Sequence, residues 1–332
     1  MMHQGILSTV GQTPLVRLAK LFADANFNVF AKLEAFNPGG SIKDRSALRI
    51  IQAALEEGAI SRDTTIVESS SGNMGIGLAL ACAYLGLRFI CVVDSRTTAQ
   101  NIRILEAYGA EIEFVSTPDP LTGEFLPARI QRVKSLLSEI ENSFWPDQYS
   151  NLYNARAHHQ TMHEIATELD GKIEYLFCST STCGTLRGCV EYAQMHHLLT
   201  NIIAVDALGS VIFGGQPGRR LIPGHGAAIK PDLYFEGLCD RCVHVSDFEC
   251  VVNCRQLVKH EAILAGGSSG GVLAAVRQIR NEIPKGANCV VIFPDRGERY
   301  LDTIYSKAWV CEHFGSAALE IELPEEELSV SG

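Results

Sequence analysis

Apolar residues follow two different spacings along this chain. Short strand-like runs, rich in apolar and β-branched residues, lie at 64–68, 87–93, 111–115, 173–178, 202–206 and 289–294. Between them, apolar residues recur at helical spacing, which predicts helices over 47–55, 75–85, 98–108, 125–140, 152–169, 186–196, 246–262 and 272–283. Strands that alternate with helices in this way predict parallel sheets covered by helices on both faces.

The alternation comes in two series, separated by the two consecutive helices at 125–140 and 152–169. Two series predict an α/β protein with two parallel-sheet lobes. Ligands of such proteins bind at the carboxyl ends of the strands, so we expect a site in the cleft between the lobes. The acidic tail at 320–332 is expected to fray.

Composition narrows the class of protein further. A length of 332 residues with 46% apolar residues suits about two domains with a full core. The net charge of −10 disfavours nucleic acid and anionic membranes as partners. No apolar run is long enough to span a bilayer, and the first residues lack a basic and then apolar signal design. We therefore expect a cytoplasmic protein that acts on small molecules.

The cysteines point to reduced thiols. There are eleven of them, an odd number scattered through strand-like and helix-like segments. Cys239, Cys242, Cys250 and Cys254 approach the spacing of a zinc site. The last two, however, fall on the helix predicted over 246–262, so we favour free thiols over a structural metal and expect no metal centre.

One lysine stands where its chemistry could be altered. Lys43 follows the turn Pro38-Gly39-Gly40, at the point where a helix begins. The positive end of a helix dipole disfavours an ammonium, so the pKa of this amine should fall and the amine should become a usable nucleophile. A lysine of this kind suits a Schiff base. An ordinary surface lysine in a first helical turn is the alternative, and this segment alone does not decide between them.

Three loops of small residues each follow a strand or open a helix, at 69–75, 179–185 and 266–271. Hydroxyls and backbone N–H groups at a helix start form a cradle for a carboxylate or a phosphate. Any one of them could be a plain Gly/Ser-rich connection, but three at equivalent strand ends favour ligand binding. None carries a Walker lysine or reads G-x-G-x-x-G, which makes a nucleotide the weaker interpretation.

Taken in order, the segments 10–18, 37–45, 70–75, 181–185 and 266–270 resemble the motifs of the cysteine synthase/cystathionine β-synthase family. The members of this family are fold-type II enzymes that use pyridoxal 5′-phosphate (PLP). The resemblance covers nearly the whole chain. It implies a fold like that of the tryptophan synthase β-subunit and a homodimer. It also implies a larger lobe of 1–38 and 150–332 that binds the cofactor phosphate, and a smaller, mobile lobe of 39–149 that carries Lys43.

The resemblance also implies roles for individual residues. Lys43 would hold PLP covalently, Asn73 would bond to the ring 3′-oxygen, and Ser268 would face the pyridine nitrogen. The substrate carboxylate would be bound by Ser70, Ser71, Gly72 and Asn73. The cofactor phosphate would be bound by Ser181, Thr182, Cys183, Gly184 and Thr185.

The phosphate loop departs from the family pattern. Ser181 and Cys183 stand where the family usually has glycine. We expect the backbone donors to survive the change if φ stays negative at both positions.

The family chemistry is a β-replacement in two halves. Lys43, freed from the cofactor by the incoming amino acid, would remove the α-proton as a general base. A serine hydroxyl at the pyridine nitrogen cannot keep that nitrogen protonated as a carboxylate would, which favours loss of a β-leaving group over transamination. A nucleophile would then add to the bound α-aminoacrylate.

Three further segments, at 205–214, 223–227 and 294–302, are unlike ordinary cysteine synthases, which usually read Pro-Ser-Ser-Gly-Glu-Arg-Tyr-Leu near the end. They resemble the N-(2-amino-2-carboxyethyl)-L-glutamate synthase branch of 2,3-diaminopropionate and siderophore biosynthesis. That branch replaces the phosphate of O-phospho-L-serine with the amino group of L-glutamate. Both substrates bring extra negative charge, so the site should hold more cations. Arg129 and Tyr149 are our substrate-site candidates, and the other cations considered are Arg187, Arg219, Arg220 and Arg296.

Three alternatives remain open at this point. The closest is a cysteine synthase that combines O-phosphoserine or O-acetylserine with sulfide. A second is a catalytically silent member that acts as a binding partner, against which the intact Lys43 and Asn73 argue. The third is a serine or threonine dehydratase of the same fold type.

Overall fold

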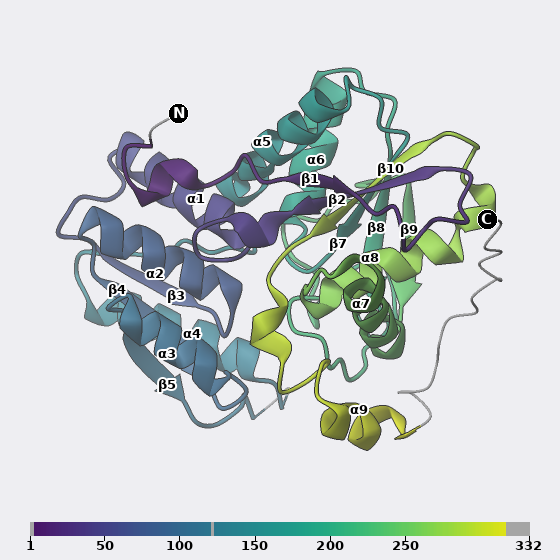
Figure 1. Ribbon diagram of the computed structural model, residues 1–332. Helices are drawn as coiled ribbons and strands as arrows, with labels where there is room; N and C mark the ends of the chain where they lie inside the picture. Colours follow the sequence, from purple (N-terminus) through teal and green to yellow (C-terminus); the bar gives the residue numbers. More distant parts are fainter. Residues whose placement is uncertain (1–2, 121–122, 317–332) are drawn as a thin grey trace.

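Two sheets organise the computed structural model, which describes residues 3–120 and 123–316. The larger sheet has six strands in the spatial order β1-β2-β10-β7-β8-β9, shown at the upper right of Figure 1. Every neighbouring pair in it is parallel except the first. Its strands are β1 (Leu15–Arg17), β2 (Asn28–Leu33), β7 (Tyr175–Ser179), β8 (Asn201–Ala207), β9 (Arg241–Val245) and β10 (Asn288–Phe293).

The smaller sheet has four parallel strands in the order β5-β4-β3-β6. All four come from one continuous part of the chain, and Figure 1 shows three of them at the lower left. They are β3 (Thr65–Ser69), β4 (Phe89–Asp94), β5 (Glu111–Val115) and β6 (Ser143–Phe144). The fold is therefore the predicted α/β arrangement of two parallel-sheet lobes.

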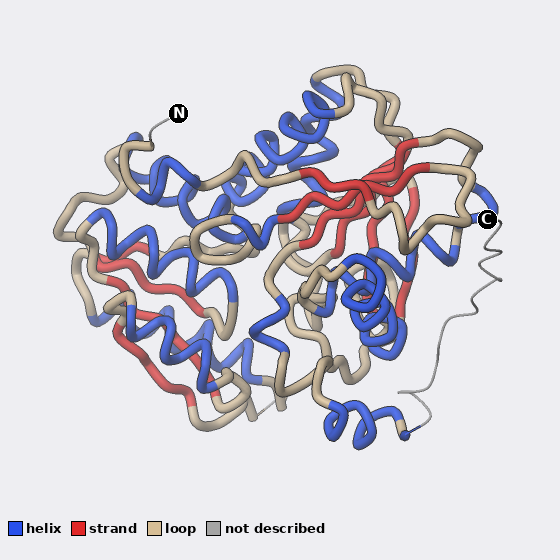
Figure 2. The backbone as a smooth tube through the Cα atoms, in the orientation of Figure 1, coloured by secondary structure: helices blue, strands red, loops and turns tan. Residues whose placement is uncertain are grey.

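Helices cover the two sheets separately. Helices α2, α3 and α4 pack on the smaller sheet, while α6, α7 and α8 belong to the larger one (Figures 1 and 2). Helices α1 and α5 pack against each other. The helices are α1 (Lys43–Glu56), α2 (Asn73–Leu85), α3 (Ala99–Ala107), α4 (Phe125–Glu139), α5 (Leu152–Glu168), α6 (Gly184–Met195), α7 (Asp247–Glu261), α8 (Gly267–Gln278) and α9 (Lys307–Phe314), with short 3₁₀ turns at Ile6–Thr9, Glu34–Phe36, Arg280–Glu282 and Gly297–Tyr300.

The strands of the larger sheet are apolar on both faces because helices cover both. Phe177 and Val291 lie in one cluster of buried residues, with side chains of α7 and α8. Their neighbours Leu176 and Val290 lie in the opposite cluster, with side chains of α5 and α6. Successive side chains of a strand point to opposite faces, so a strand buried on both sides reads as a continuous apolar run. In the described part of the chain, no helix is long and apolar enough to cross a membrane.

Some elements differ from the sequence prediction. β1 and β2 were not predicted, and they form an antiparallel pair at the edge of the larger sheet. β1 is short and largely exposed, so it lacks the apolar signature of a buried strand. Helix α8 begins at Gly267 rather than at Val272, because the glycine and serine run is itself helical. The tail at 320–332, predicted to fray, lies outside the described residues.

A buried group of charges ties α1 to the larger sheet. Arg45, two residues after Lys43, donates to both carboxylate oxygens of Glu34, at 2.7 and 2.8 Å. It also bonds to both oxygens of Glu164 on α5, at 2.7 Å each. Lys32 of β2 lies 2.7 Å from Glu164 and donates to the carbonyl oxygen of Thr13. We call Lys32, Glu34, Arg45 and Glu164 the buried charge network.

Candidate active site

Lys43 lies where the two lobes meet. It is the first residue of α1, and the backbone just before it is attached to the end of β10: the Ile42 amide donates to the Pro294 carbonyl at 2.7 Å, and Ser41 bridges to Asp295. The Lys43 ammonium lies 3.4 Å from the Thr182 hydroxyl, beyond the end of β7. The carboxyl ends of two neighbouring strands, β10 and β7, therefore converge on this amine, as expected for a parallel sheet.

The environment of Lys43 changes its acidity. Burial lowers the pKa of the Lys43 amine from its ordinary value to about 8. At that value a substantial fraction of the amine is neutral in weakly alkaline solution, whereas an exposed lysine is almost fully charged. A neutral amine can act as a nucleophile or accept a proton. The pKa moves in the direction predicted from the sequence, although burial rather than the helix dipole is the main cause.

The loop at 179–185 leads from β7 into α6. Helix α6 has no side-chain cap, so its first N–H groups remain available to an anion. The Thr182 hydroxyl accepts from the Asn154 side chain at 3.2 Å and from the Gly184 amide at 3.4 Å. A Cβ at Gly184 would lie 2.5 Å from the Asn154 side chain, so only glycine fits there. This arrangement is suited to a phosphate.

The condition that we set for the backbone donors of this loop, a negative φ at both positions, is not met at Cys183. Its φ is +63°, in the left-handed region that favours glycine, whereas Ser181 is not among the residues with positive φ. A non-glycine residue pays roughly 1–2 kcal/mol there. The Cys183 side chain, 2% exposed, packs in the apolar cluster under the loop, which offsets part of that cost. Burial also raises the pKa of its thiol to about 12, so the sulfur stays protonated and its backbone is the part available to a ligand.

The loop at 69–75 turns from β3 into α2. The Ser70 hydroxyl accepts from the amides of Gly72, at 3.3 Å, and Gly75, at 2.9 Å. The Ser71 carbonyl accepts from Asn101 at 3.0 Å. Helix α2 begins at Asn73 with no side-chain cap. The loop is thus held from both sides, and of the first three amides of α2 that of Gly75 is engaged by Ser70, which leaves those of Asn73 and Met74 to a carboxylate.

Asn73 reaches across to the larger sheet. Its side-chain NH₂ donates to Asp295 at 2.7 Å, and its side-chain oxygen accepts from Arg299. The Asp295 backbone carbonyl in turn accepts from the Gly266 amide at 3.1 Å, directly before α8. Ser268, predicted to face the pyridine nitrogen, lies buried in the first turn of α8. Asn73 and the start of α8 are thereby both attached to Asp295.

Arg129 is buried in α4 with unused bonding capacity. Its Nε lies 3.1 Å from an Asp94 oxygen, but Nε and Nη1 form no aligned hydrogen bond with the described residues. Burial raises the pKa of Tyr149, and the charges of Arg129 and Arg220 oppose that rise. Arg220 also has a buried Nε without a partner among the described residues. The charges that act on Tyr149 thus include two arginines with buried, unpartnered nitrogens and two carboxylates, Glu68 and Asp147.

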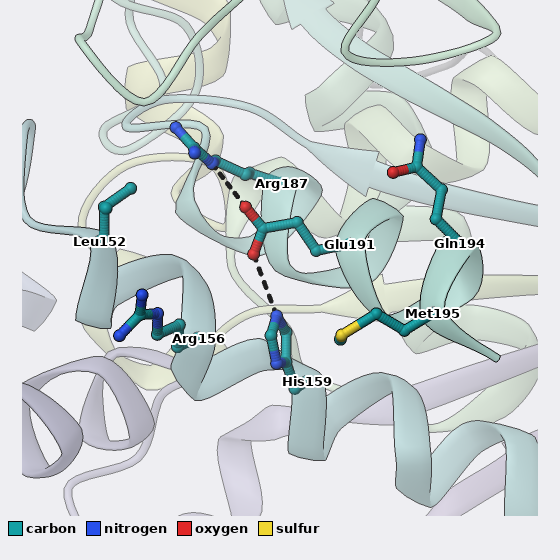
Figure 3. Close-up of a pocket in the computed structure, with 7 residues that line it drawn as sticks. All are labelled: Leu152, Arg156, His159, Arg187, Glu191, Gln194 and Met195. Atoms are coloured by element: carbon teal, nitrogen blue, oxygen red, sulfur yellow. Dashed lines mark hydrogen bonds and ion pairs between the residues drawn. The ribbon is translucent and has the colours of Figure 1, made fainter.

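Of the other candidate arginines, Arg187 and Arg296 have side-chain partners within the protein. Arg187 pairs with Glu191 at 2.8 Å, and Figure 3 shows Arg187 and His159 pointing at that carboxylate from either side of a surface cavity. None of the residues around Lys43 lines this cavity. Arg296 donates to the Ala35 carbonyl, and Arg219 is exposed. Of the four arginines not selected from the sequence, only Arg220 approaches Tyr149.

Two residues of this site, Asp295 and Arg299, were missed as site residues. Both lie in the segment 294–302, which we singled out from the sequence as a whole without assigning a role to either residue. The cysteines show no site: Cys250 and Cys254 are buried in α7, while Cys239 and Cys242 are half-buried. Within the described residues, no group of three or more histidines, cysteines or acidic residues is placed to hold a metal.

The residues fit pyridoxal 5′-phosphate. A covalent bond to an aldehyde needs an amine that is neutral near physiological pH, and Lys43 supplies one. The phosphate needs several N–H donors near that amine, and the uncapped start of α6 lies directly beside Thr182, which the amine contacts. A buried cradle that excludes a Cβ at Gly184 leaves the backbone accessible to the phosphate oxygens.

Comparisons with known proteins agree with this geometry. A family model described as "Pyridoxal-phosphate dependent enzyme" matches residues 6–295. Cysteine synthase of Entamoeba histolytica is 32% identical over 92% of this chain and 91% of that one, with a TM-score of 0.86. An O-acetylserine dependent cystathionine β-synthase of Helicobacter pylori is 31% identical over 92% and 100% of the two chains, with a TM-score of 0.84. An O-ureido-L-serine synthase is 29% identical over 97% and 100%, with a TM-score of 0.85.

Proposed function

Because the chain belongs to the family of pyridoxal-phosphate dependent enzymes, we propose that it replaces the phosphate of O-phospho-L-serine with the amino group of L-glutamate. The products are N-(2-amino-2-carboxyethyl)-L-glutamate and phosphate. At the coarser level the chain is a PLP-dependent enzyme of the cysteine synthase family, and its chemistry is β-replacement. The proposal concerns which leaving group and which nucleophile it uses.

Each part of the candidate site has a proposed role in this reaction. Amides and hydroxyls at the start of α6 hold the cofactor phosphate, and those at the start of α2 bind the substrate carboxylate. The Lys43 amine anchors the cofactor and, once released, takes the proton from the substrate Cα. When bound, pyridoxal 5′-phosphate would supply the conjugated ring that stabilises negative charge at Cα. The Ser268 hydroxyl, in the first turn of α8, would be the group nearest the pyridine nitrogen.

One observation carries the choice of substrates: Arg129 is 8% exposed and holds two nitrogens without hydrogen bonds in the described structure. A buried guanidinium with unused donors is costly unless a ligand completes its bonding. Phosphate and carboxylate oxygens are the partners that guanidinium groups bind most strongly. Sulfide has no such oxygens. Arg129, with Arg220 near Tyr149, therefore favours a pair of substrates that bring additional anionic groups.

The test is a paired-substrate assay. Holoenzyme is incubated with O-phospho-L-serine and either L-glutamate or sulfide, and the products are identified by mass. We expect the glutamate adduct with release of phosphate. Product from sulfide alone would contradict the proposal and support the alternative of a cysteine synthase, which the names of two similar structures from Entamoeba histolytica favour. Pyruvate without a second substrate would indicate a dehydratase.

Arg129→Lys provides a second arm of the same assay. A lysine keeps the positive charge but lacks the planar guanidinium, which can donate two parallel hydrogen bonds to one anion. The KM for an anionic substrate should therefore rise by about tenfold or more, while the absorption of the bound cofactor stays unchanged. Arg132→Lys is the matched control, because that arginine lies on the same helix, α4, and is engaged with Glu113 and Glu139. Equal effects of the two substitutions would remove Arg129 from the substrate site.

The remaining features are proposed on the resemblance. We assign 39–149 to the smaller, mobile lobe, 1–38 and 150–332 to the larger lobe, and the enzyme to the cytoplasm. The product would serve the synthesis of 2,3-diaminopropionate for a siderophore.

We also propose a homodimer. Apolar side chains on and beside α5 and α6 support it, since Leu152 is 43%, Met195 56% and Leu199 95% exposed. Light scattering of the holoenzyme should give about twice the chain mass of 36.2 kDa. A monomer across the working concentration range would refute the assignment.

A further inference from the structure

The segment 294–300, which follows β10, forms hydrogen bonds with the loop that precedes Lys43. The Arg296 amide donates to the Gly40 carbonyl at 3.3 Å, and the Arg299 guanidinium donates to the Gly39 carbonyl. The Arg296 side chain reaches the Ala35 carbonyl at 3.1 and 3.2 Å. The side chain of Asp295 lies between these contacts and the start of α8, where its backbone carbonyl accepts from the Gly266 amide.

Asp295 is a buried carboxylate with a definite set of partners. It is 2% exposed, and one oxygen, Oδ2, accepts from Asn73 at 2.7 Å and from the Tyr300 hydroxyl at 2.6 Å. The other oxygen, Oδ1, has no hydrogen-bond partner in the described structure and faces Gly266, where a Cβ would lie 1.9 Å away. Burial raises the pKa of Asp295, while its bonds to Tyr300 and Asn73 oppose that rise.

The amide of Asn73 is consequently held at both ends. Asp295 can only accept from the NH₂ end when ionised, and Arg299 can only donate to the oxygen end. The amide therefore cannot flip. One N–H of Asn73 stays free to donate elsewhere, and its direction is set by the two residues behind it.

From this geometry we infer that Asp295 is a positioning residue for Asn73. It fixes the amide so that the second N–H of Asn73 is presented to the ring oxygen of the cofactor, and Arg299 assists from the oxygen end. The inference rests on the role proposed above for Asn73. Asp295 acts through Asn73, to which its Oδ2 is hydrogen-bonded.

The contact also joins the two sheets. Asn73 begins α2, which packs on the smaller sheet, whereas Asp295 follows β10 of the larger sheet. The two residues are 222 positions apart. Asp295 therefore ties the position of the Asn73 amide to the strand that also holds the Lys43 backbone.

A double-mutant cycle on the holoenzyme tests the inference. The readouts are the cofactor dissociation constant and the position of its visible absorption band. Asn73→Ala and Asp295→Ala should each weaken cofactor binding by about tenfold and shift the band in the same direction. The double variant should lose about tenfold, rather than the hundredfold that independent effects would give, because both changes remove one interaction.

Three further variants separate positioning from a merely structural role. Asp295→Asn keeps an acceptor oxygen in place and should restore most of the affinity and the band position. Tyr300→Phe removes the other donor to the same oxygen and should leave both readouts within about twofold of the parent. If Asp295→Ala fails to fold, Asp295→Ser takes its place, because its oxygen lies one bond nearer the backbone and cannot replace the carboxylate.

The possible results of the cycle contradict different proposals. An additive cycle, or an unshifted band in Asp295→Ala beside a shifted one in Asn73→Ala, would overturn this inference alone. An unshifted band in Asn73→Ala would instead overturn the role of Asn73, on which the inference depends. Neither result would alter the substrate assignment, which the product assay measures separately.

Discussion

Replacing Lys43 with alanine should abolish turnover together with the visible absorption of the bound cofactor. In the proposed mechanism the amine is both the covalent anchor and the group that moves the α-proton, and loss of a positioned general base alone costs about 10²–10⁴-fold in rate. The fold should survive, because the Lys43 side chain makes a single hydrogen bond, 3.4 Å long, to Thr182. Turnover with each substrate pair and the absorption spectrum are measured on the same preparation.

Lys134→Ala is the matched control for this experiment. That lysine is exposed in the middle of α4, where alanine is a good helix former, so rate and spectrum should match those of the parent. Circular dichroism of Lys43→Ala should remain that of a folded α/β protein. Turnover that persists in Lys43→Ala would refute the assignment of this lysine as anchor and base.

Replacing Glu34 with alanine should lower the free energy of unfolding by about 3–5 kcal/mol, because it leaves Arg45 buried with part of its charge uncompensated. Arg45 is 3% exposed and donates to Glu34 through two nitrogens. The same change should also weaken cofactor binding, since Arg45 lies in α1 two residues after Lys43. Urea unfolding followed by tryptophan fluorescence measures the first effect.

Glu111→Ala is the matched control for Glu34→Ala. Glu111 also forms a bidentate ion pair with an arginine, since it accepts hydrogen bonds from Arg88 at 2.6 and 2.7 Å. Both of these side chains, however, are about half exposed. Exposed pairs contribute roughly 1 kcal/mol or less. If Glu34→Ala costs no more than Glu111→Ala, the buried charge network does not stabilise the Lys43 helix.

The predictions for Lys43 and Glu34 concern the reactive amine and the anchoring of the helix that carries it. The amine of Lys43 must be partly neutral, which requires a weakly solvated position, while the helix that carries it must stay in place. The buried charge network anchors α1 on the side of β2 and α5, and the 294–300 segment holds the loop on the side of the cleft. A reactive amine is thereby kept at a fixed distance from the phosphate loop.

The cofactor and the fold class were predictable from the sequence, and both are confirmed. The roles of the individual site residues stay predictions, although the structure brings Lys43 beside Thr182. The sign of φ at Cys183, on which our condition for the phosphate loop depended, could not be predicted because a backbone angle in a tight loop depends on the packing around it. That side chain accepts a positive φ while buried in an apolar cluster which no local pattern reveals.

The selection among the arginines could not be made from the sequence either. Arg129, Arg187 and Arg220 have the same chemistry, and only their three-dimensional partners distinguish them. Arg187 has Glu191 one helical turn away, whereas Arg129 and Arg220 retain unpartnered nitrogens near Tyr149. Local spacing could have suggested the Arg187–Glu191 pair, but not the approach of Arg220 to Tyr149 from a distant loop.

The sequence by itself determined the features that depend on neighbours along the chain. These are the alternation of strands and helices, the Lys43 turn, and the small-residue loops at helix starts, because periodicity and turn chemistry act over a few residues. Only the tertiary structure decided the antiparallel β1–β2 edge and the contact of Asn73 with Asp295. β1 is short and largely exposed, so no apolar pattern marks it. Asn73 and Asp295 are 222 positions apart, and their contact arises from the packing of whole lobes, which no local pattern encodes.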